Sequence, residues 1–273
     1  MAKLKLEELI MEITRVCNLD CGHCFRGESQ NAYMDINTIR NLMSNIESID
    51  HLVLSGGEPL IALHQLFEVA DTIHRNGIRV DRISVITNGT VLSSEIIKAL
   101  EMLREVCKEL SVRISDDKFH RMALDRKNLK NRRNVNYALL NKLFGATLYG
   151  TPRREQVISL IESVGRAKNL TDEDMKKVNE YGDYQTYYTL TDSDIFGGTD
   201  LTVDYKAPYY AGNLEIKERV NIDVNGYLAD GYASYEESDS HNIDECNINN
   251  VSLLEAVKHN SERVYVVKQK RLK

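Results

Sequence analysis

A regular alternation of strand-type and helix-type segments fills the first 115 residues and restricts the fold more than any other feature. Short apolar or alternating runs, typical of strands, occupy residues 9–16, 51–55, 81–87 and 111–115. Apolar residues at helical spacing lie between them, from Asp35 to Ile46, from Leu63 to Gly77 and from Ser93 to Leu110. Repeated strand–helix units predict a parallel sheet with right-handed crossovers.

The fold class that follows is α/β: a partial (β/α)6 TIM-like barrel of parallel strands with a small C-terminal α+β appendage. In such a barrel the active site lies at the C-terminal ends of the strands. We place the barrel core in residues 1–205 and the appendage in residues 206–273. In the appendage, Asn225-Gly226 between two apolar runs predicts a β-hairpin.

The second half is less regular, and each segment carries its own prediction. The basic stretch 121–142 is expected to be helical, Gln156–Ser163 a buried strand, and the polar, Tyr-rich stretch 171–200 a loop or lid. Residues 252–268 are expected to form a closing helix followed by a strand.

Composition bounds the class of protein. The formal net charge of −6 argues against a dedicated nucleic-acid binder. Charged residues interrupt the apolar N-terminal segment, and no later apolar run is long enough to span a membrane, so we expect a cytoplasmic protein. Clustered cysteines in a reducing compartment more often bind metal or do chemistry than form disulfides.

Three cysteines, Cys17, Cys21 and Cys24, lie within eight residues after the first predicted strand, at the spacing C-x3-C-x2-C. Three thiolates on one short loop suit a cubane iron–sulfur cluster in which each binds a different iron. The alternative is zinc, for which His23 would complete a Cys3His site. His23 adjoins Cys24 directly, however, and chelation by adjacent residues is awkward in a short loop.

The segment CNLDCGHC followed by LSGGEP resembles the radical S-adenosylmethionine (SAM) superfamily. The resemblance implies a [4Fe–4S] cluster on Cys17, Cys21 and Cys24, with the fourth iron open to the amine and carboxylate of SAM. His23 holds the place of a residue, usually aromatic, that lies beside the adenine. The segment Gly56-Gly57-Glu58-Pro59 corresponds to the family's second motif, which binds the SAM amino group. The glycines also allow the backbone to approach a ligand closely.

Three further segments extend the resemblance to about residue 167. Thr87 and Asn88 resemble a motif near the SAM ribose, and Ser115 a serine that contacts the ribose or carboxylate. Arg126, eleven residues after Ser115, corresponds to an arginine that binds the SAM carboxylate in peptide- and protein-modifying members. Arg166 belongs to a GRA segment found after the fifth strand of those members. An ordinary surface arginine is the alternative for Arg126 and for Arg166.

The C-terminal stretch looks like the SPASM/twitch appendage of the same superfamily, but without the cysteines that hold auxiliary clusters. Apart from the clustered three, only Cys107 and Cys246 are present, too few for a second cluster. Cys246 is predicted to donate a hydrogen atom to a substrate radical, with an inert thiol as the alternative. Cys107 is predicted to lie in the core beside a helix.

The resemblance also implies a reaction. An external donor of the flavodoxin or ferredoxin class would reduce the cluster, SAM would be cleaved to methionine and a 5′-deoxyadenosyl radical, and that radical would abstract hydrogen from the substrate. We expect a side chain of a ribosomally made peptide or of a protein, with a precursor peptide as a possible partner. The alternatives are a radical SAM enzyme acting on a small molecule or nucleotide, and a non-enzymatic zinc or iron–sulfur protein.

Overall fold

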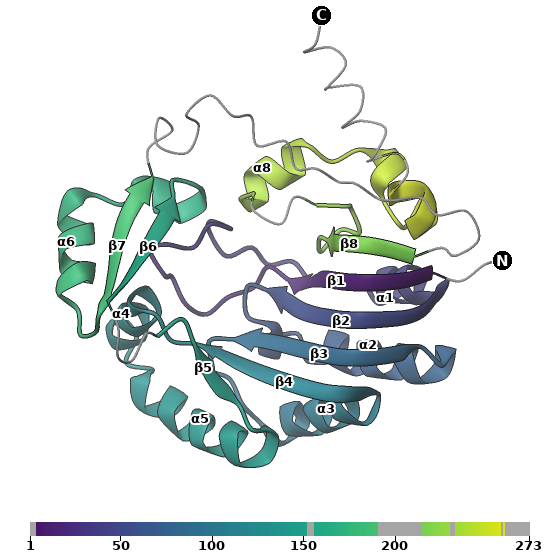
Figure 1. Ribbon diagram of the computed structural model, residues 1–273, viewed down its shortest axis with the longest axis horizontal. Helices are drawn as coiled ribbons and strands as arrows, with labels where there is room; N and C mark the ends of the chain where they lie inside the picture. Colours follow the sequence, from purple (N-terminus) through teal and green to yellow (C-terminus); the bar gives the residue numbers. More distant parts are fainter. Residues whose placement is uncertain (1–3, 152–155, 191–214, 230–232, 258, 260–273) are drawn as a thin grey trace, which may run out of the picture.

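The computed structural model describes residues 4–151, 156–190, 215–229, 233–257 and 259. Its centre is a parallel six-stranded sheet of order β5-β4-β3-β2-β1-β8 (Figure 1). The strands are β1 (Leu4–Thr14), β2 (Ile46–Gly56), β3 (Arg79–Thr87), β4 (Cys107–Ser115), β5 (Thr147–Tyr149) and β8 (Glu215–Ile222). The α/β class and the parallel sheet are confirmed.

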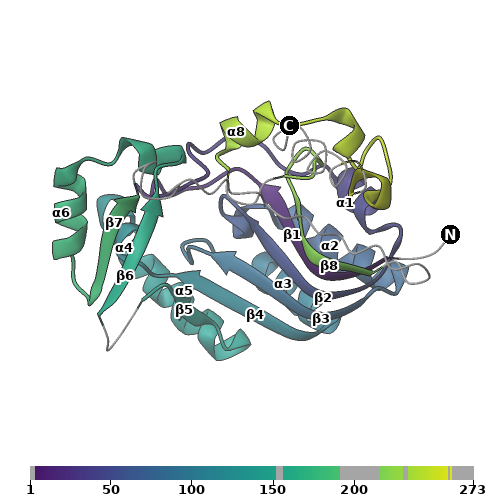
Figure 2. The same cartoon turned by 45° about the horizontal axis from the view of Figure 1, so that its top comes forward.

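Three helices, α1 (Ile36–Met43), α2 (Leu63–Asn76) and α3 (Ser94–Glu105), cover one face of this sheet (Figure 2). Alternate residues of the central strands, such as Leu9, Met11 and Ile13 of β1, are fully buried in one hydrophobic core with these helices. The opposite face, which we call the inner face, carries the remaining alternate residues, and many of these are polar. Because side chains alternate across a strand, the two faces are chemically distinct.

The predicted helix starts and stops are confirmed, but two of the predicted helices were too long. Asp35 and Ser93 cap α1 and α3 through their side chains, and Gly77 ends α2 at φ 61°. Ile46 belongs to β2, and Cys107 begins β4 instead of lying beside a helix. Ile46 and Leu110 continue the helical spacing of the preceding helices although they belong to strands, and both pack against the same core as those helices.

The middle of the chain departs further from expectation. The stretch 121–142 forms two helices, α4 (Lys118–Arg126) and α5 (Lys130–Phe144), broken near Asn128 at φ 54°. The predicted strand 156–163 is β6 (Val157–Glu162), but Ile158 and Leu160 are about 60% exposed (63% and 60%) instead of buried. It pairs with β7 (Gln185–Leu190) in a separate two-stranded sheet.

The prediction of a loop or lid over 171–200 is wrong for its first twenty residues; residues 191–200 lie outside the described part. This region contains α6 (Asp172–Glu180), which begins with a capping box of Thr171 and Asp174, and then β7. Met175 and Val178 of α6 pack with Phe119 and Tyr187 in a small second core. The helix buries only these two apolar residues. The rest of the segment is polar, so the sequence shows no clear helical pattern there.

The C-terminal part completes the main sheet. β8 pairs in parallel with β1, and its residues Ile216, Val220 and Ile222 belong to the main core. The expected turn at Asn225-Gly226 is present, but the chain returns through isolated bridges such as Ile222–Leu228, so the hairpin was only partly correct. The helix α8 (Tyr235–Ser240) and a 3-10 turn (Asp244–Cys246) follow.

Two predictions for the C-terminal part fall outside the described residues. The boundary between residues 205 and 206 and the last predicted strand both lie there, and both stay predictions. Within the described residues, no helix is long and apolar enough to cross a membrane.

Candidate functional site

The three clustered cysteines lie on one loop, residues 15–33, which leaves the C-terminal end of β1. The loop turns at Cys21 and Cys24, where Cys24 N donates to Cys21 O at 3.1 Å and Gly27 N donates to Cys24 O at 3.2 Å. All three thiols are free. Burial raises the pKa of Cys17 to about 12, and the nearby Glu58, Cys21 and Cys24 contribute. The three thiols therefore come from one short loop, and Cys21 and Cys24 lie near enough to Cys17 to affect its pKa.

The paired glycines after β2 press against this loop. Gly57 N donates to Thr14 O and Glu58 N to Val16 O, both at 2.8 Å. A Cβ added to Gly56 would lie 2.1 Å from Thr14 O, and one added to Gly57 would lie 2.3 Å from Val16 O. In this structure, therefore, the backbone that the glycines approach closely is that of the cysteine loop itself.

Replacing Gly57 by alanine should displace the cysteine loop. Overpacking against the Val16 carbonyl is expected to lower the free energy of unfolding by about 1–3 kcal/mol and to reduce the iron bound after reconstitution to less than half. Gly77→Ala is the matched control, because its added Cβ meets no atom within 4 Å and only the φ of +61° is unfavourable. Denaturant titration and iron analysis of both variants measure this, and full iron loading in Gly57→Ala would contradict it.

Glu58 organises the neighbouring loop from a fully buried position. Its carboxylate accepts hydrogen bonds from Thr87 Oγ1 at 2.6 Å, Asn88 N at 2.7 Å and Leu60 N at 3.0 Å. Burial raises its pKa, and these three donors oppose the rise. Both carboxylate oxygens are engaged by the chain, so here Glu58 joins the end of β2 to the end of β3. Pro59, also buried, opens the short 3-10 turn that follows.

Asn88 brings the end of β3 to the first cysteine. Its Nδ2 donates to Asn18 Oδ1 at 2.9 Å and lies 4.0 Å from Cys17 Sγ. Thr90 N and Oγ1 both donate to Asn88 Oδ1, which fixes the orientation of the amide. The predicted ribose motif and the predicted cluster motif are therefore in direct contact.

Ser115, predicted to contact the SAM ribose or carboxylate, and Arg126, predicted to bind the SAM carboxylate, have different surroundings. Ser115 is the last residue of β4. The Arg126 guanidinium is about half exposed and donates to Asp20 O and Oδ1, both at 3.0 Å, so it braces the cysteine loop. Arg133, which the sequence did not single out, forms a buried ion pair with Asp116. The only sequence signal for Arg133 is the basic stretch around it, and such a stretch is also typical of a solvated helix face.

Arg166 holds the far side of the cysteine loop. Its Nε donates to Cys21 O and its backbone N to Cys24 O, both at 2.9 Å. The preceding Gly165 has φ 58°, and a Cβ there would lie 2.1 Å from Phe25 O. The side chain is 12% exposed, so the alternative of an ordinary surface arginine is not what the structure shows.

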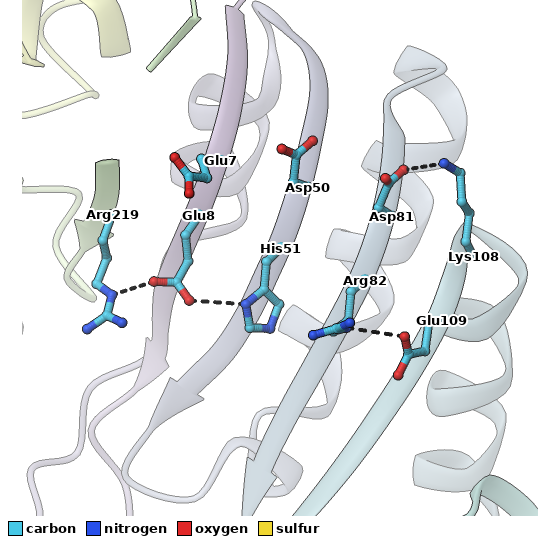
Figure 3. A pocket seen from close by; sticks show the side chains of 9 residues that line it. All are labelled: Glu7, Glu8, Asp50, His51, Asp81, Arg82, Lys108, Glu109 and Arg219. Carbon is cyan, nitrogen blue, oxygen red and sulfur yellow. Dashed lines mark hydrogen bonds and ion pairs between the residues drawn. The ribbon is translucent and has the colours of Figure 1, made fainter. Parts of the chain in front are cut away.

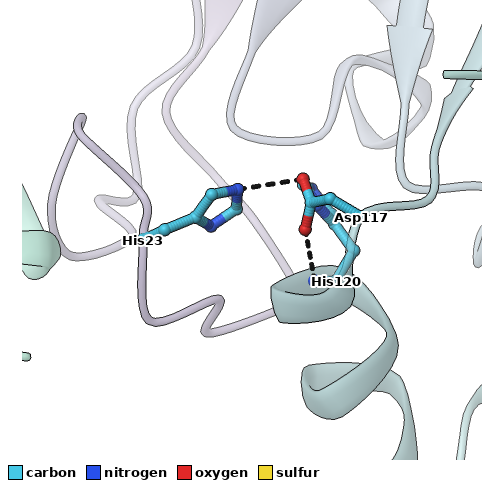
Figure 4. A group of neighbouring side chains, drawn as sticks. All are labelled: His23, Asp117 and His120. Atoms are coloured by element: carbon cyan, nitrogen blue, oxygen red, sulfur yellow. Dashed lines mark hydrogen bonds and ion pairs between the residues drawn. The ribbon is translucent and has the colours of Figure 1, made fainter. Parts of the chain in front are cut away.

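The His23 side chain joins a cluster with Asp117 and His120 (Figure 4). Asp117 Oδ2 lies 3.0 Å from His23 Nε2 and 2.8 Å from His120 Nδ1, and the His23 ring stacks on Phe119 at 4.6 Å. Burial works against the charged forms, but the histidines hold the pKa of Asp117 well below its usual value. Asp117 and Cys21 likewise hold the pKa of His120 well above its usual value. The three side chains could together ligate a cation.

A buried ion network anchors the base of the cysteine loop, and the sequence did not reveal it. Arg15, 2% exposed, donates to Glu12 at 2.7 Å, to Asp223 at 3.2 Å and to Asp239 at 2.7 and 2.8 Å. Its guanidinium also lies 4.6 Å from the ring centroid of Tyr235. Asp223 and Asp239 come from segments more than 200 residues away, so no local pattern indicates them. The network ties the C-terminal segment to the loop.

A sequence model of the radical SAM superfamily matches residues 11–152, a little over half of the chain. An uncharacterized protein of Methanocaldococcus jannaschii, MJ0907, is 26% identical over 113 residues, which are 40% of this chain and 37% of that protein. The AdoMet-dependent heme synthase of Methanosarcina barkeri is 37% identical over 95 residues, 33% of this chain and 26% of that protein. The match covers 37% of the length of MJ0907 and 26% of that of the heme synthase. This chain therefore spans only about a third of these relatives.

The fold is similar to that of a solved structure described as native anSMEcpe with bound AdoMet, another name for SAM, and Cp18Cys peptide. The TM-score is 0.55 and the sequence identity 14%, over 96% of this chain and 81% of that one. At this identity the likeness concerns the fold. It extends beyond the segment that the family model matches.

Proposed function

Because the chain belongs to the radical SAM superfamily, we propose that it is an enzyme that binds a [4Fe–4S] cluster and SAM and uses them on a peptide or protein side chain. The observation that carries the proposal is the presence of three free thiols on one short loop, with that loop held by its neighbours on several sides. Cys17, Cys21 and Cys24 would hold the cluster, because three thiolates leave one iron open.

When bound, the cluster and SAM supply the radical that removes a hydrogen atom from the substrate; the chain's own residues position and shield them. Gly56 and Gly57 set the distance between the cysteine loop and the end of β2. Glu58 and Asn88 join the ends of β2 and β3 to it, and Arg166 holds its other side. Glu58, Thr87 and Asn88, which lie beside the loop at the strand ends, are buried and limit the access of water from that side.

The SAM-binding residues proposed from the resemblance are His23, Gly56, Gly57, Glu58, Pro59, Thr87, Asn88, Ser115, Arg126 and Arg166. Arg126 would exchange its exposed pair with Asp20 for the SAM carboxylate, at little energetic cost, since exposed ion pairs contribute little. Cys246 is buried at 3% exposure, and its role as hydrogen-atom donor stays a proposal. An electron donor of the flavodoxin or ferredoxin class is likewise proposed.

A peptide substrate is favoured by the family features after β4 and by the fold likeness to a structure that contains a peptide. The match to a heme synthase covers a third of this chain, and it keeps a small-molecule substrate as the second candidate. A genomic neighbour that encodes a short precursor peptide would separate the two.

The test is to reconstitute the protein anaerobically with iron and sulfide, reduce it, add SAM and quantify 5′-deoxyadenosine by chromatography. We expect about four irons per chain and formation of deoxyadenosine. If the reduced protein forms none, SAM binding is measured directly, since cleavage can require bound substrate. One tightly held zinc with no acid-labile sulfide would overturn the proposal in favour of a non-enzymatic metal protein.

A further inference from the structure

The inner face of the main sheet carries a row of charged side chains and one histidine that pair with one another. Figure 3 shows Arg219, Glu8, His51, Arg82 and Glu109 in front of the sheet, with the helices behind it. Glu8 pairs with Arg219 and, at 3.0 Å, with His51, while Arg82 pairs with Glu109 at 3.2 Å. They line a hollow of about 760 Å³. In this row each charge already has its partner.

Arg113 lies on the same face, nearer to the cofactor site. Its neighbours Val112 and Ile114 are buried in the core, so alternation places Arg113 on the inner face. The register continues from the pair Arg82–Glu109 to Ile86–Arg113. Arg113 is two residues before Ser115, a distance of roughly 7 Å along the strand. It therefore lies just below the end of the strand where SAM is proposed to bind.

Arg113 differs from the arginines around it in having no carboxylate partner among the described residues. Its guanidinium instead lies 5.9 Å from the ring centroid of Tyr149 on β5, a ring that is 58% exposed. Three acids of the sheet and of the strand ends already have a cation: Glu109 pairs with Arg82, Glu12 with Arg15 and Asp116 with Arg133. The positive charge of Arg113 acts on the inner face. Burial lowers the pKa of His51, and Arg82 and Arg113 lower it further.

We propose that Arg113 binds a carboxylate of the substrate and so selects, within the peptide or protein class proposed above, for an acidic side chain next to the reacting carbon. A half-buried guanidinium without a partner favours a carboxylate, which it can bind through two parallel hydrogen bonds. Tyr149 supports the guanidinium from one side through a cation–π contact. This inference rests on the proposed function for the identity of the molecule that bears the carboxylate.

The test measures binding and needs no radical chemistry. Reconstituted protein with SAM bound is titrated, in the oxidised state, with acetyl-Gly-Glu-Gly-amide and acetyl-Gly-Gln-Gly-amide, and with glutarate as a carboxylate that is not a peptide. We expect the native protein to bind the Glu peptide at least about fivefold more tightly than the Gln peptide, in line with a charge-assisted hydrogen bond. Arg113→Gln should abolish this preference and Arg113→Lys should keep part of it.

Arg82→Gln is the matched control, because Arg82 lies on the same face but already pairs with Glu109; it should keep the preference. Equal binding of the two peptides and no binding of glutarate by the native protein would overturn the proposal. So would a loss of SAM affinity in Arg113→Gln, which would assign Arg113 to the carboxylate of SAM itself. Binding of glutarate that depends on Arg113, without binding of the Glu peptide, would support the carboxylate site and refute the peptide substrate.

Discussion

Replacing Cys17 by alanine should leave a folded chain that retains no [4Fe–4S] cluster and forms no 5′-deoxyadenosine above background. Two thiolates cannot hold a cubane that needs three or four. The fold should survive, because the loop backbone is fixed by other contacts: Cys17 N bonds Ser29 Oγ at 2.8 Å, and Gly57 N and Glu58 N bond the backbone beside it. Iron analysis, absorbance after reconstitution and deoxyadenosine chromatography check the three parts of the expectation.

Cys107→Ala is the matched control for this experiment. Cys107 is also a free, half-buried cysteine, but it lies at the start of β4, at the opposite end of the strand from Ser115. This variant should bind as much iron as the native protein and form as much deoxyadenosine. Equal iron in Cys17→Ala and native protein would show that the metal is held elsewhere, and the assignment of the cluster to this loop would fail.

Arg15→Met should produce the largest loss of stability of any single substitution considered for this chain. Arg15 and its partners Glu12 and Asp223 are each almost fully buried. Removing the arginine leaves Asp223 without an ion-pair partner among the described residues and leaves Glu12 with Arg26 alone, at 3.6 Å. Breaking comparable buried pairs costs about 3–5 kcal/mol. Because Arg15 is two residues before Cys17, iron loading should fall as well. Urea denaturation at neutral pH measures the first effect and iron analysis the second.

The same variant should show a characteristic dependence on pH. Burial, with Glu12 nearby, already raises the pKa of Asp223 to about 6 despite Arg15, and without the arginine it should rise further. A carboxyl whose folded pKa is raised contributes stability below its unfolded pKa and loses it as the pH rises through the folded value. The deficit of Arg15→Met relative to the native protein should therefore be larger at pH 8 than at pH 5.

An exposed arginine provides the comparison for Arg15. Arg79 forms an ion pair with Glu47, but its side chain is 68% exposed, so Arg79→Gln should leave the denaturation midpoint unchanged. A loss in Arg15→Met no larger than that in Arg79→Gln would mean that the buried network does not hold the C-terminal segment. In that case the dependence of iron loading on Arg15 would also be expected to disappear.

Several parts of the molecule could be predicted from local sequence because short-range physics decides them. The helix starts at Asp35 and Ser93 depend on side chains that bond the backbone a few residues away, and the stop at Gly77 depends on a left-handed residue. The parallel sheet follows from repeated strand–helix units. The place of the cysteines, on one loop after the first strand, follows from their spacing directly after that strand; their role as cluster ligands stays a proposal.

The sequence by itself thus determined the α/β class, the edge of the sheet from which the cysteine loop leaves and the residue types proposed to hold a cluster. Only the tertiary structure decided what those residues touch. Gly57 is a glycine because the cysteine loop passes over it, Glu58 is buried beneath Thr87 and Asn88, and Arg15 meets acids more than 200 residues away. Such contacts join segments that are distant in the chain, and a local sequence pattern does not indicate which distant residue will pack against it.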